Sequence, residues 1–469
     1  GATDQVTLTT APAEGPFATL AGLTANTTYY LRVRTVPHNG PAPPFVELGS
    51  TRTLINPPAA AAVPFTAVGL SSASVVWSHN GNPVGVTTYT VVLTSGSSFP
   101  NVFSGNVSFT TNPAGAVPAA GFSGLSPNTS YFFFGRGISP EGVSGPFILL
   151  GSSPTLAMPA ATAASTFVVV DVSSLSVSWD HNGNPAGQSQ YAAVLSTASP
   201  LVLSHAGNVS ITTRPAGALP QATLAGLSIN ATYFLFVGAL NHQGLGAGFT
   251  ALGSTATLVN TPLSVAATFS ALTPGGFGLS WDPNGNPLGV TSYTVHVTTA
   301  FDFSAGATDA VTFTTAPAGA AFATVSGLAG NTTYYARLRA VNHVGAASYF
   351  QTLGATVTFT FPPATVAGTF TAVGESSMSV AWSHNGNPVV ITTYTVVLTT
   401  GPAYPNSYAG NVEFTTNPAE SPAGATVGGL AANTTYFLFI RSVNQIGAGE
   451  AFIAFGATST LSAMPASVV

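Results

Sequence analysis

The stretch Gly22-Leu-Thr-Ala-Asn-Thr-Thr-Tyr29 is the first of five related copies that organise this 469-residue chain. The other copies run Gly124-Leu-Ser-Pro-Asn-Thr-Ser-Tyr131, Gly226-Leu-Ser-Ile-Asn-Ala-Thr-Tyr233, Gly327-Leu-Ala-Gly-Asn-Thr-Thr-Tyr334 and Gly429-Leu-Ala-Ala-Asn-Thr-Thr-Tyr436. The tyrosines that end the copies are 102, 102, 101 and 102 residues apart. A fixed period of this kind indicates an array built from one repeated module.

The residues around each tyrosine identify the module. After the first copy, Tyr29, Leu31 and Val33 alternate with Tyr30, Arg32 and Arg34, which is the two-residue period of a β-strand. A leucine lies six residues before every tyrosine, and a threonine lies two residues before it in four copies, as Thr27, Thr129, Thr332 and Thr434; the fifth copy has Ala231. This pattern resembles the Leu-x-Pro-x-Thr-x-Tyr corner of fibronectin type III domains, although only Pro127 fills the proline position.

One tryptophan in each period strengthens the resemblance. The tryptophans are Trp77, Trp179, Trp281 and Trp382, and a tyrosine follows each by twelve residues, as Tyr89, Tyr191, Tyr293 and Tyr394. The family carries such residues on strands B and C of its sandwich. The resemblance therefore implies an all-β fold, a tandem array of seven-stranded immunoglobulin-like (fibronectin type III) sandwiches, four complete and one partial.

The period also predicts the domain boundaries. We expect complete modules at residues 57–157, 158–260, 261–361 and 362–463, the C-terminal half of a module at 1–56, and the start of a next module or a linker at 464–469. Within the half-module we expect strands at residues 6–9, at 17–20 and from Tyr29 onward. Short proline-containing junctions predict stiff, end-to-end modules that form a rod. A half-module cannot close by itself, so either a neighbouring chain donates the missing strands or the polypeptide continues; we expect the second, that these residues belong to a longer repeat protein.

Composition excludes several classes of function. Only 4% of the residues are charged, against roughly 25% in ordinary soluble domains. The net charge of −5 is diffuse, so we expect no nucleic-acid partner, and no apolar run is long enough for a membrane span. The chain has no cysteine. A surface with so few charges repels its own kind weakly, which favours self-association.

A six-residue loop that ends in Asn-Gly-Asn-Pro follows each tryptophan, at residues 78–83, 180–185, 282–287 and 383–388. Its Asn-Gly pair supplies the positive φ angles of a tight turn. In the family, this loop lies at the end of the module that faces the preceding module. We therefore interpret the following loop residues as an inter-module joint: His79, Asn80, His181, Asn182, Asn284, His384 and Asn385.

We find no catalytic constellation in the sequence. The thirteen carboxylates are scattered, and no motif of a nucleophile, a phosphate loop or a calcium loop is present. Only one module, with His181 and His242, brings two histidines to the same end, and two histidines make a poor zinc site. We therefore predict a protein that is not an enzyme and that has no cofactor, no metal and no catalytic residue.

Every copy of the corner contains an Asn-x-Thr/Ser triplet, which is also the acceptor sequence for N-glycosylation. The asparagines, called the corner asparagines below, are Asn26, Asn128, Asn230, Asn331 and Asn433. Two interpretations are open. These side chains bond the backbone of the turn, or they lie exposed and carry glycans that cover a surface poor in charge.

Aromatic side chains on the strand after the corner suggest a contact face. With the corner tyrosine inward, the alternation directs Phe132, Phe134, Phe234, Phe236, Phe437 and Phe439 outward. In the two other copies, the outward residues are Tyr30, Arg32 and Arg34, and Tyr335, Arg337 and Arg339. One interpretation is cover by loops of the same module, and the other is a self-association face.

These observations predict a structural role. We expect a non-catalytic repeat protein, extracellular or on a cell surface, that forms a rigid stalk or the body of a filament or adhesin. Its partners would be further copies of itself in a homo-oligomer or filament, with glycans as a possible addition. The alternative is a set of spacer or accessory modules of a secreted polysaccharide-acting enzyme whose catalytic domain lies outside these residues.

Overall fold

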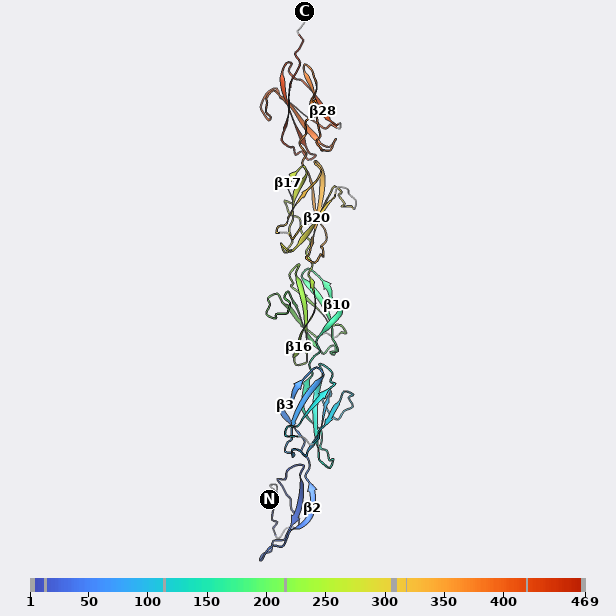
Figure 1. The fold of residues 1–469 in the computed structure, drawn as a ribbon, viewed down its shortest axis with the longest axis vertical. Helices are drawn as coiled ribbons and strands as arrows, with labels where there is room; N and C mark the ends of the chain where they lie inside the picture. Colours follow the sequence, from blue (N-terminus) through green and yellow to red (C-terminus); the bar gives the residue numbers. More distant parts are fainter. Residues whose placement is uncertain are drawn as a thin grey trace, which may run out of the picture. The chain divides into compact units, whose positions relative to one another are not determined.

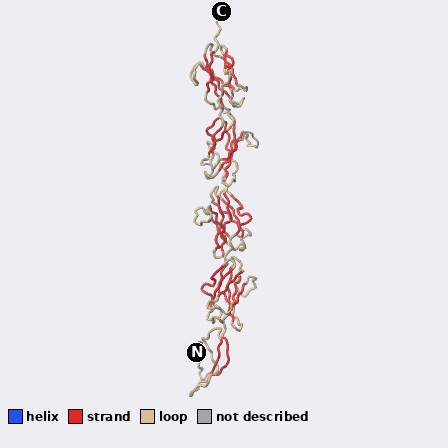
Figure 2. The backbone as a smooth tube through the Cα atoms, in the orientation of Figure 1, coloured by secondary structure: helices blue, strands red, loops and turns tan. Residues whose placement is uncertain are grey.

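The structure is a computed structural model that describes residues 5–11, 15–112, 115–214, 217–304, 310–317, 319–418 and 421–464. The chain divides into two compact units. The first contains residues 1–169, 174–226 and 233–255, and the second contains residues 170–173, 227–232 and 256–469. Every regular element in the described part of the chain is a strand, as Figure 2 shows.

Each complete module is built from a three-stranded and a four-stranded antiparallel sheet, so it has the seven strands predicted. In the first complete module, the strands are β3 (Ala59–Val68), β4 (Ser72–Ser78), β5 (Thr88–Thr94), β6 (Val107–Thr110), β7 (Ala119–Ser123), β8 (Ser130–Ile138) and β9 (Ile148–Pro154). The sheets have the orders β3-β4-β7 and β6-β5-β8-β9. The labels in Figure 1 locate β3 in this module and β10 and β16 in the next.

The same two sheets recur in the other modules. The second complete module contains β10 (Ala161–Val170), β11 (Ser174–Asp180), β12 (Gln190–Ser196), β13 (Val209–Thr213), β14 (Gln221–Ala225), β15 (Thr232–Leu240) and β16 (Gly246–Ala256). The third contains β17 (Phe269–Thr273), β18 (Gly276–Ser280), β19 (Ser292–Thr298), β20 (Val311–Thr314), β21 (Phe322–Ser326), β22 (Thr333–Val341) and β23 (Gln351–Val357). The fourth contains β24 (Phe370–Val373), β25 (Ser377–Trp382), β26 (Thr393–Thr399), β27 (Val412–Thr416), β28 (Ala423–Gly428), β29 (Thr435–Val443) and β30 (Ile453–Ser459).

The two sheets of a module enclose a core of inward-facing residues. In the fourth module, Trp382 at the end of β25 packs against Tyr394 of β26, with ring centroids 5.4 Å apart, and both side chains are fully buried. The equivalent tryptophan–tyrosine pairs in the other modules are 4.9 to 5.7 Å apart. Aromatic pairs at this spacing add to the stabilisation that comes from burying their apolar area.

The corner tyrosine holds the turn that precedes its strand. The hydroxyl of Tyr131 accepts a hydrogen bond from the backbone N–H of Ser126 at 2.9 Å, and the Tyr334 and Tyr436 hydroxyls accept from Ala329 and Ala431 in the same way. Corner asparagines such as Asn331 adopt positive φ, here 50°, which asparagine tolerates better than most residues do. The Asn-Gly turns also have the positive φ angles that the sequence predicts.

The half-module forms less structure than the sequence predicts. Among its described residues, 5–11 and 15–56, the half-module has only the strands β1 (Thr28–Val33) and β2 (Val46–Arg52), which pair with each other. The strands expected at residues 6–9 and 17–20 are not formed, since those residues have no strand partner. Leu31 and Val33, the inward-facing residues of β1, are 45% and 49% exposed because no second sheet covers them. Of residues 464–469, only residue 464 lies within the described part of the chain.

Candidate functional site at the module junctions

The corner asparagine is the centre of each junction between consecutive modules. Four of the corner asparagines are buried, with exposed fractions of 0% for Asn26, Asn128 and Asn331 and 4% for Asn230. Their amides are buried by residues of the following module, as described below. Two junctions lie within the first compact unit and two within the second.

In all four junctions, the asparagine Nδ2 donates to a hydroxyl that lies 61 residues further along the chain. The pairs are Asn26–Thr87, Asn128–Ser189, Asn230–Thr291 and Asn331–Thr392, with N–O distances of 3.0, 2.7, 3.0 and 3.0 Å. The four acceptors, called the junction hydroxyls below, are fully buried. The hydroxyls of Thr87, Ser189 and Thr392 also donate to the carbonyl of the proline that ends the Asn-Gly loop, so these three are satisfied as donor and acceptor.

A second loop of the following module completes the junction. This loop, called the junction loop, lies between β22 and β23 in the third module and between β29 and β30 in the fourth. In the third module, the N–H and the ring Nδ1 of His343 both contact Asn230 Oδ1, at 2.9 and 2.7 Å, and its Nε2 contacts Thr232 Oγ1 at 2.8 Å. An amide oxygen can only accept, so Nδ1 carries a proton and donates it to Asn230, while the threonine hydroxyl can either donate to Nε2 or accept from it.

The fourth module repeats this arrangement with a different side chain. The N–H of Gln445 donates to Asn331 Oδ1 at 2.9 Å, and its Nε2 donates to Thr333 Oγ1 at 2.8 Å. Both polar members of the Asn-x-Thr triplet are therefore bonded by the next module. This explains why a hydroxyl is present at Thr232, where the family threonine is replaced by Ala231.

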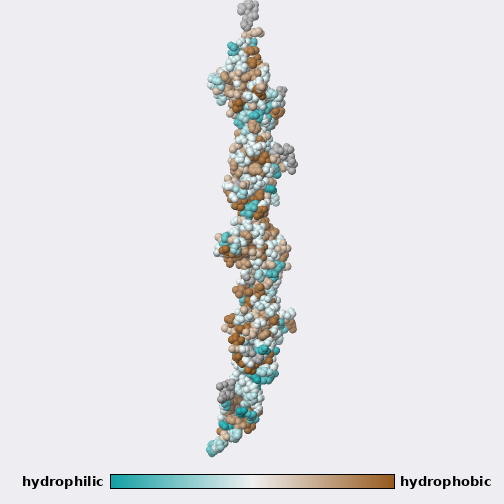
Figure 3. All heavy atoms as spheres, in the orientation of Figure 1, coloured by the Kyte–Doolittle hydropathy of each residue, from teal (hydrophilic) through white to brown (hydrophobic). Residues whose placement is uncertain are grey.

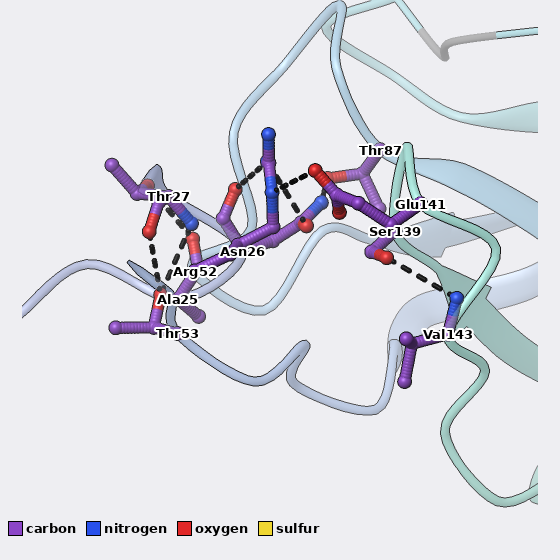
Figure 4. Close-up of polar contacts among 9 residues, drawn as sticks. All are labelled: Ala25, Asn26, Thr27, Arg52, Thr53, Thr87, Ser139, Glu141 and Val143. Carbon is purple, nitrogen blue, oxygen red and sulfur yellow. Dashed lines mark hydrogen bonds and ion pairs between the residues drawn. The ribbon is translucent and has the colours of Figure 1, made fainter. Parts of the chain in front are cut away.

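The first junction uses an ion pair instead. Arg52 Nε donates to Glu141 Oε1 at 2.8 Å, and Arg52 Nη1 donates to the Asn26 carbonyl at 2.8 Å (Figure 4). Glu141 lies in the junction loop of the first complete module, between β8 and β9, so the arginine links the corner to this loop. Burial opposes the ionisation of Glu141, but hydrogen bonds from its own backbone and from Ser139, together with the charge of Arg52, lower its pKa overall. At the second junction, the buried Asn128 Oδ1 has no hydrogen-bond partner among the described residues.

N-glycosylation needs an exposed asparagine, and four of the five corner asparagines do not have this exposure. Asn26, Asn128, Asn230 and Asn331 are buried, and the nitrogen that would carry a sugar donates a hydrogen bond across the junction. Asn433 alone of the corner asparagines is exposed. It has the same backbone conformation, with φ at 49°.

The Asn-Gly loop contributes to the joint only in part. The Nδ2 atoms of Asn80, Asn182, Asn284 and Asn385 donate to carbonyls of the linker that enters their own module, at 2.8 to 2.9 Å. The histidines point into their own module instead. His79 and His181 each contact the core tyrosine hydroxyl through Nδ1, at 3.0 and 2.9 Å, and a backbone carbonyl through Nε2. His384 contacts the hydroxyl of Tyr394 at 2.9 Å.

The prediction that these histidines form the joint is therefore wrong, because they fix the tyrosine of strand C. Burial raises the pKa of Tyr89, Tyr191 and Tyr293, and it raises the pKa of Tyr394 to about 12. No cluster of three or more metal-ligating side chains occurs among the described residues. Those residues also include no helix that could span a membrane.

The outward phenylalanines are covered, which agrees with the interpretation of cover by loops of the same module and not with an exposed self-association face. Phe134, Phe236 and Phe439 are buried at 6% exposure each, and Phe132, Phe234 and Phe437 are half-buried. In the first complete module, the ring centroid of Phe99, in the loop after β5, lies 6.0 Å from that of Phe134, and the ring centroid of Phe147 lies 4.7 Å from that of Phe99. In the fourth, Tyr404 and Phe452 cover Phe439 in the same way. Loops of the same module therefore occupy this face.

Sequence reasoning missed the junction hydroxyls. The signal was present in the repeat, because a threonine or serine stands directly before strand C in every complete module, 61 residues after the preceding corner asparagine. The signal is weak because threonine and serine are common throughout this chain.

Residues 362–452 match the family described as Fibronectin type III domain. A search of curated proteins gives no match. Among solved structures, the chain is similar to a two-domain fibronectin type III segment of chicken tenascin, with 18% identity and a TM-score of 0.28 over 43% of this chain and 100% of that one. It is also similar to domains FN1–FN3 of chicken CNTN1, with 15% identity and a TM-score of 0.22 over 65% of this chain and 98% of that one.

The repeated pair of sheets and the tyrosine corner define an array of β-sandwich modules. The module at 362–452 matches the family, and its strand order recurs in the three complete modules before it. The chain is therefore a tandem array of β-sandwich modules, and the module at residues 362–452 matches the fibronectin type III family. Such domains are typical of extracellular or surface proteins and are generally not catalytic.

Proposed function

We propose that the chain is a structural array, extracellular or on a cell surface, that serves as a stiff stalk or as the body of a filament or adhesin. The observation that carries the proposal is the repeated junction. At each of the four junctions, a buried asparagine amide donates to a buried hydroxyl of the next module. Buried polar groups of this kind depend on a fixed geometry, because separating them leaves donors or acceptors unsatisfied.

Self-association remains part of the proposal, although the phenylalanines predicted for it do not support it. The most exposed large apolar side chains of the complete modules lie in loops, and those after strand C include Val102 at 100%, Phe301 at 77% and Tyr408 at 51%. On the face drawn in Figure 3, hydrophobic residues are scattered among hydrophilic ones in both units. With 4% charged residues, the chain has little electrostatic repulsion to oppose lateral contact.

Small-angle scattering on the full chain tests the stiffness. The variant carries Thr87→Val, Ser189→Ala, Thr291→Val and Thr392→Val, which remove the junction hydroxyls and keep similar side-chain volumes. We expect the parent to scatter as an extended rod and the variant as a more flexible, more compact particle. A control with Thr90→Val and Thr294→Val, on the outer sheet face, should match the parent. A compact parent, or a variant that scatters like the parent, would overturn the proposal.

A further inference from the structure

The arginines of this chain are concentrated at one kind of position. Six of the eight basic residues, which are all arginine, lie on the strand that begins at the corner tyrosine or directly after its end. They are Arg32, Arg34, Arg136, Arg337, Arg339 and Arg441. Five of them stack on a phenylalanine ring, with the guanidinium carbon 4.5 to 4.8 Å from a ring centroid.

The third complete module differs from its neighbours at this position. Arg337 of the third module and Phe439 of the fourth occupy equivalent positions, since they lie 102 residues apart, which is the period of the repeat. The third module therefore has an arginine where the fourth has a phenylalanine of its aromatic stack. Arg337 stacks on Phe303 and on Phe350, at 4.5 Å from each ring, and its Nε donates to His296 Nδ1 at 3.1 Å. Arg339 stacks on the same Phe350 at 4.8 Å. Arg337 and Arg339, called the arginine pair, thus share one ring on one face of β22.

The arginine pair has no carboxylate partner among the described residues. The ion pairs formed there are Arg32–Glu47 and Arg52–Glu141. The Nε atom of Arg339 is buried without a hydrogen-bond partner in the same part of the chain. Two like charges held about 7 Å apart along a strand, partly removed from water, are electrostatically unfavourable without an anion between or beside them.

The half-module shows what this position binds when an acid is available. Arg32 is the equivalent of Arg337, and it donates to Glu47 Oε1 at 2.7 Å across the β1–β2 pair. The cross-strand partner of Arg337 is Thr352, which is exposed and has no charge. The same arginine position therefore holds a carboxylate from its own module in one copy and lacks that carboxylate in another.

We propose that the arginine pair is a binding site for an acidic peptide segment of a partner protein, with glutamate or aspartate side chains placed where Glu47 lies in the half-module. Alternate residues of an extended peptide lie on one face with the same spacing as Arg337 and Arg339, so two carboxylates of a Glu-x-Glu segment match the two guanidinium groups. Sugar recognition by ring stacking is less favoured, because Arg337 already occupies faces of Phe303 and Phe350.

Fluorescence anisotropy on the full chain tests the proposal, with a labelled Gly-Glu-Gly-Glu-Gly peptide as the probe. We expect binding at low ionic strength that weakens as salt is added. The decisive variant is Thr352→Glu, which should supply an internal carboxylate to Arg337 and weaken peptide binding at least about tenfold. Arg337→Phe, which installs the residue found at this position in the fourth module, should weaken binding by a similar factor.

Matched controls separate this site from general attraction. Arg441→Gln, in the module with a single arginine, should leave binding unchanged, and the peptide Gly-Gln-Gly-Gln-Gly should not bind. The chain carries a net charge of −5, so bulk electrostatics does not favour an acidic probe. Binding that Thr352→Glu leaves unchanged, or that the glutamine peptide reproduces, would overturn the proposal. Binding of a glucuronate oligomer but not of the peptide would also overturn it.

Discussion

Replacing Asn331 by glycine should loosen the junction between the third and fourth modules. The buried side chain makes three hydrogen bonds to the following module: Nδ2 donates to Thr392 Oγ1 at 3.0 Å and to the Ile391 carbonyl at 3.3 Å, and Oδ1 accepts from the N–H of Gln445 at 2.9 Å. Since a hydrogen bond in a folded protein contributes about 1 kcal/mol net, the junction should lose about 3 kcal/mol. Glycine accepts the φ of 50° at this position, so the turn itself is not strained.

Amide hydrogen exchange measures this loss directly, because the N–H of Gln445 is one of the bonded groups. A loss of about 3 kcal/mol raises the population of the open junction by roughly two powers of ten. A peptide spanning residues 442–448 should therefore exchange up to about one hundred times faster in the variant, until local fluctuations limit the rate.

The chain offers a matched control for this experiment. Asn433 has the same corner conformation, with φ at 49°, but its side chain is exposed. Asn433→Gly should therefore leave exchange of residues 442–448 at the parent rate. Parent-like exchange in Asn331→Gly would refute the view that the corner amide holds the junction, and equal acceleration in both variants would show a general effect of glycine at the corner.

The remaining predictions concern pH, the covered aromatics and modification. Burial raises the pKa of Tyr394 to about 12. The stability that comes from keeping this hydroxyl protonated should therefore be complete below pH 10 and should be lost as the pH rises from 10 to about 12. Tyr394→Phe should remove this part of the alkaline transition in thermal unfolding. Burial, and to a lesser extent the charge of Arg337, lower the pKa of His296. The free energy of unfolding should therefore fall as the pH drops below about 6.5 toward that lowered pKa. In His296→Gln, this dependence of stability on pH should vanish. Phe134→Ser should destabilise the first complete module by about 3–5 kcal/mol in denaturant unfolding and leave association unchanged, as the residue is buried. Mass spectrometry of native material should find bare side chains at Asn128 and Asn331, because both amides are buried in their junctions; glycans at those two would contradict the closed junctions.

Much of the fold followed from local patterns in the sequence. The period of about 102 residues, the corner tyrosine and the tryptophan of strand B predicted the repeated sandwich, because strand alternation and turn chemistry depend on neighbouring residues. The positive φ angles of the Asn-Gly turns were predicted for the same reason. The half-module was the exception, since residues 6–9 and 17–20 have strand-like sequences but lack the second sheet that would stabilise them.

The role of each surface group was decided only by the tertiary structure. From the sequence, the triplet Asn331-Thr332-Thr333 is equally compatible with glycosylation and with a structural turn, because the triplet contains the same atoms in both cases. The structure decides between them by placing Thr392 and Gln445, which lie 61 and 114 residues further along the chain, against its polar groups. Likewise, Phe134 is outward by alternation but buried by Phe99 of another loop. Sequence alternation determines which face of a strand a side chain occupies, whereas its burial depends on what the rest of the chain packs against that face.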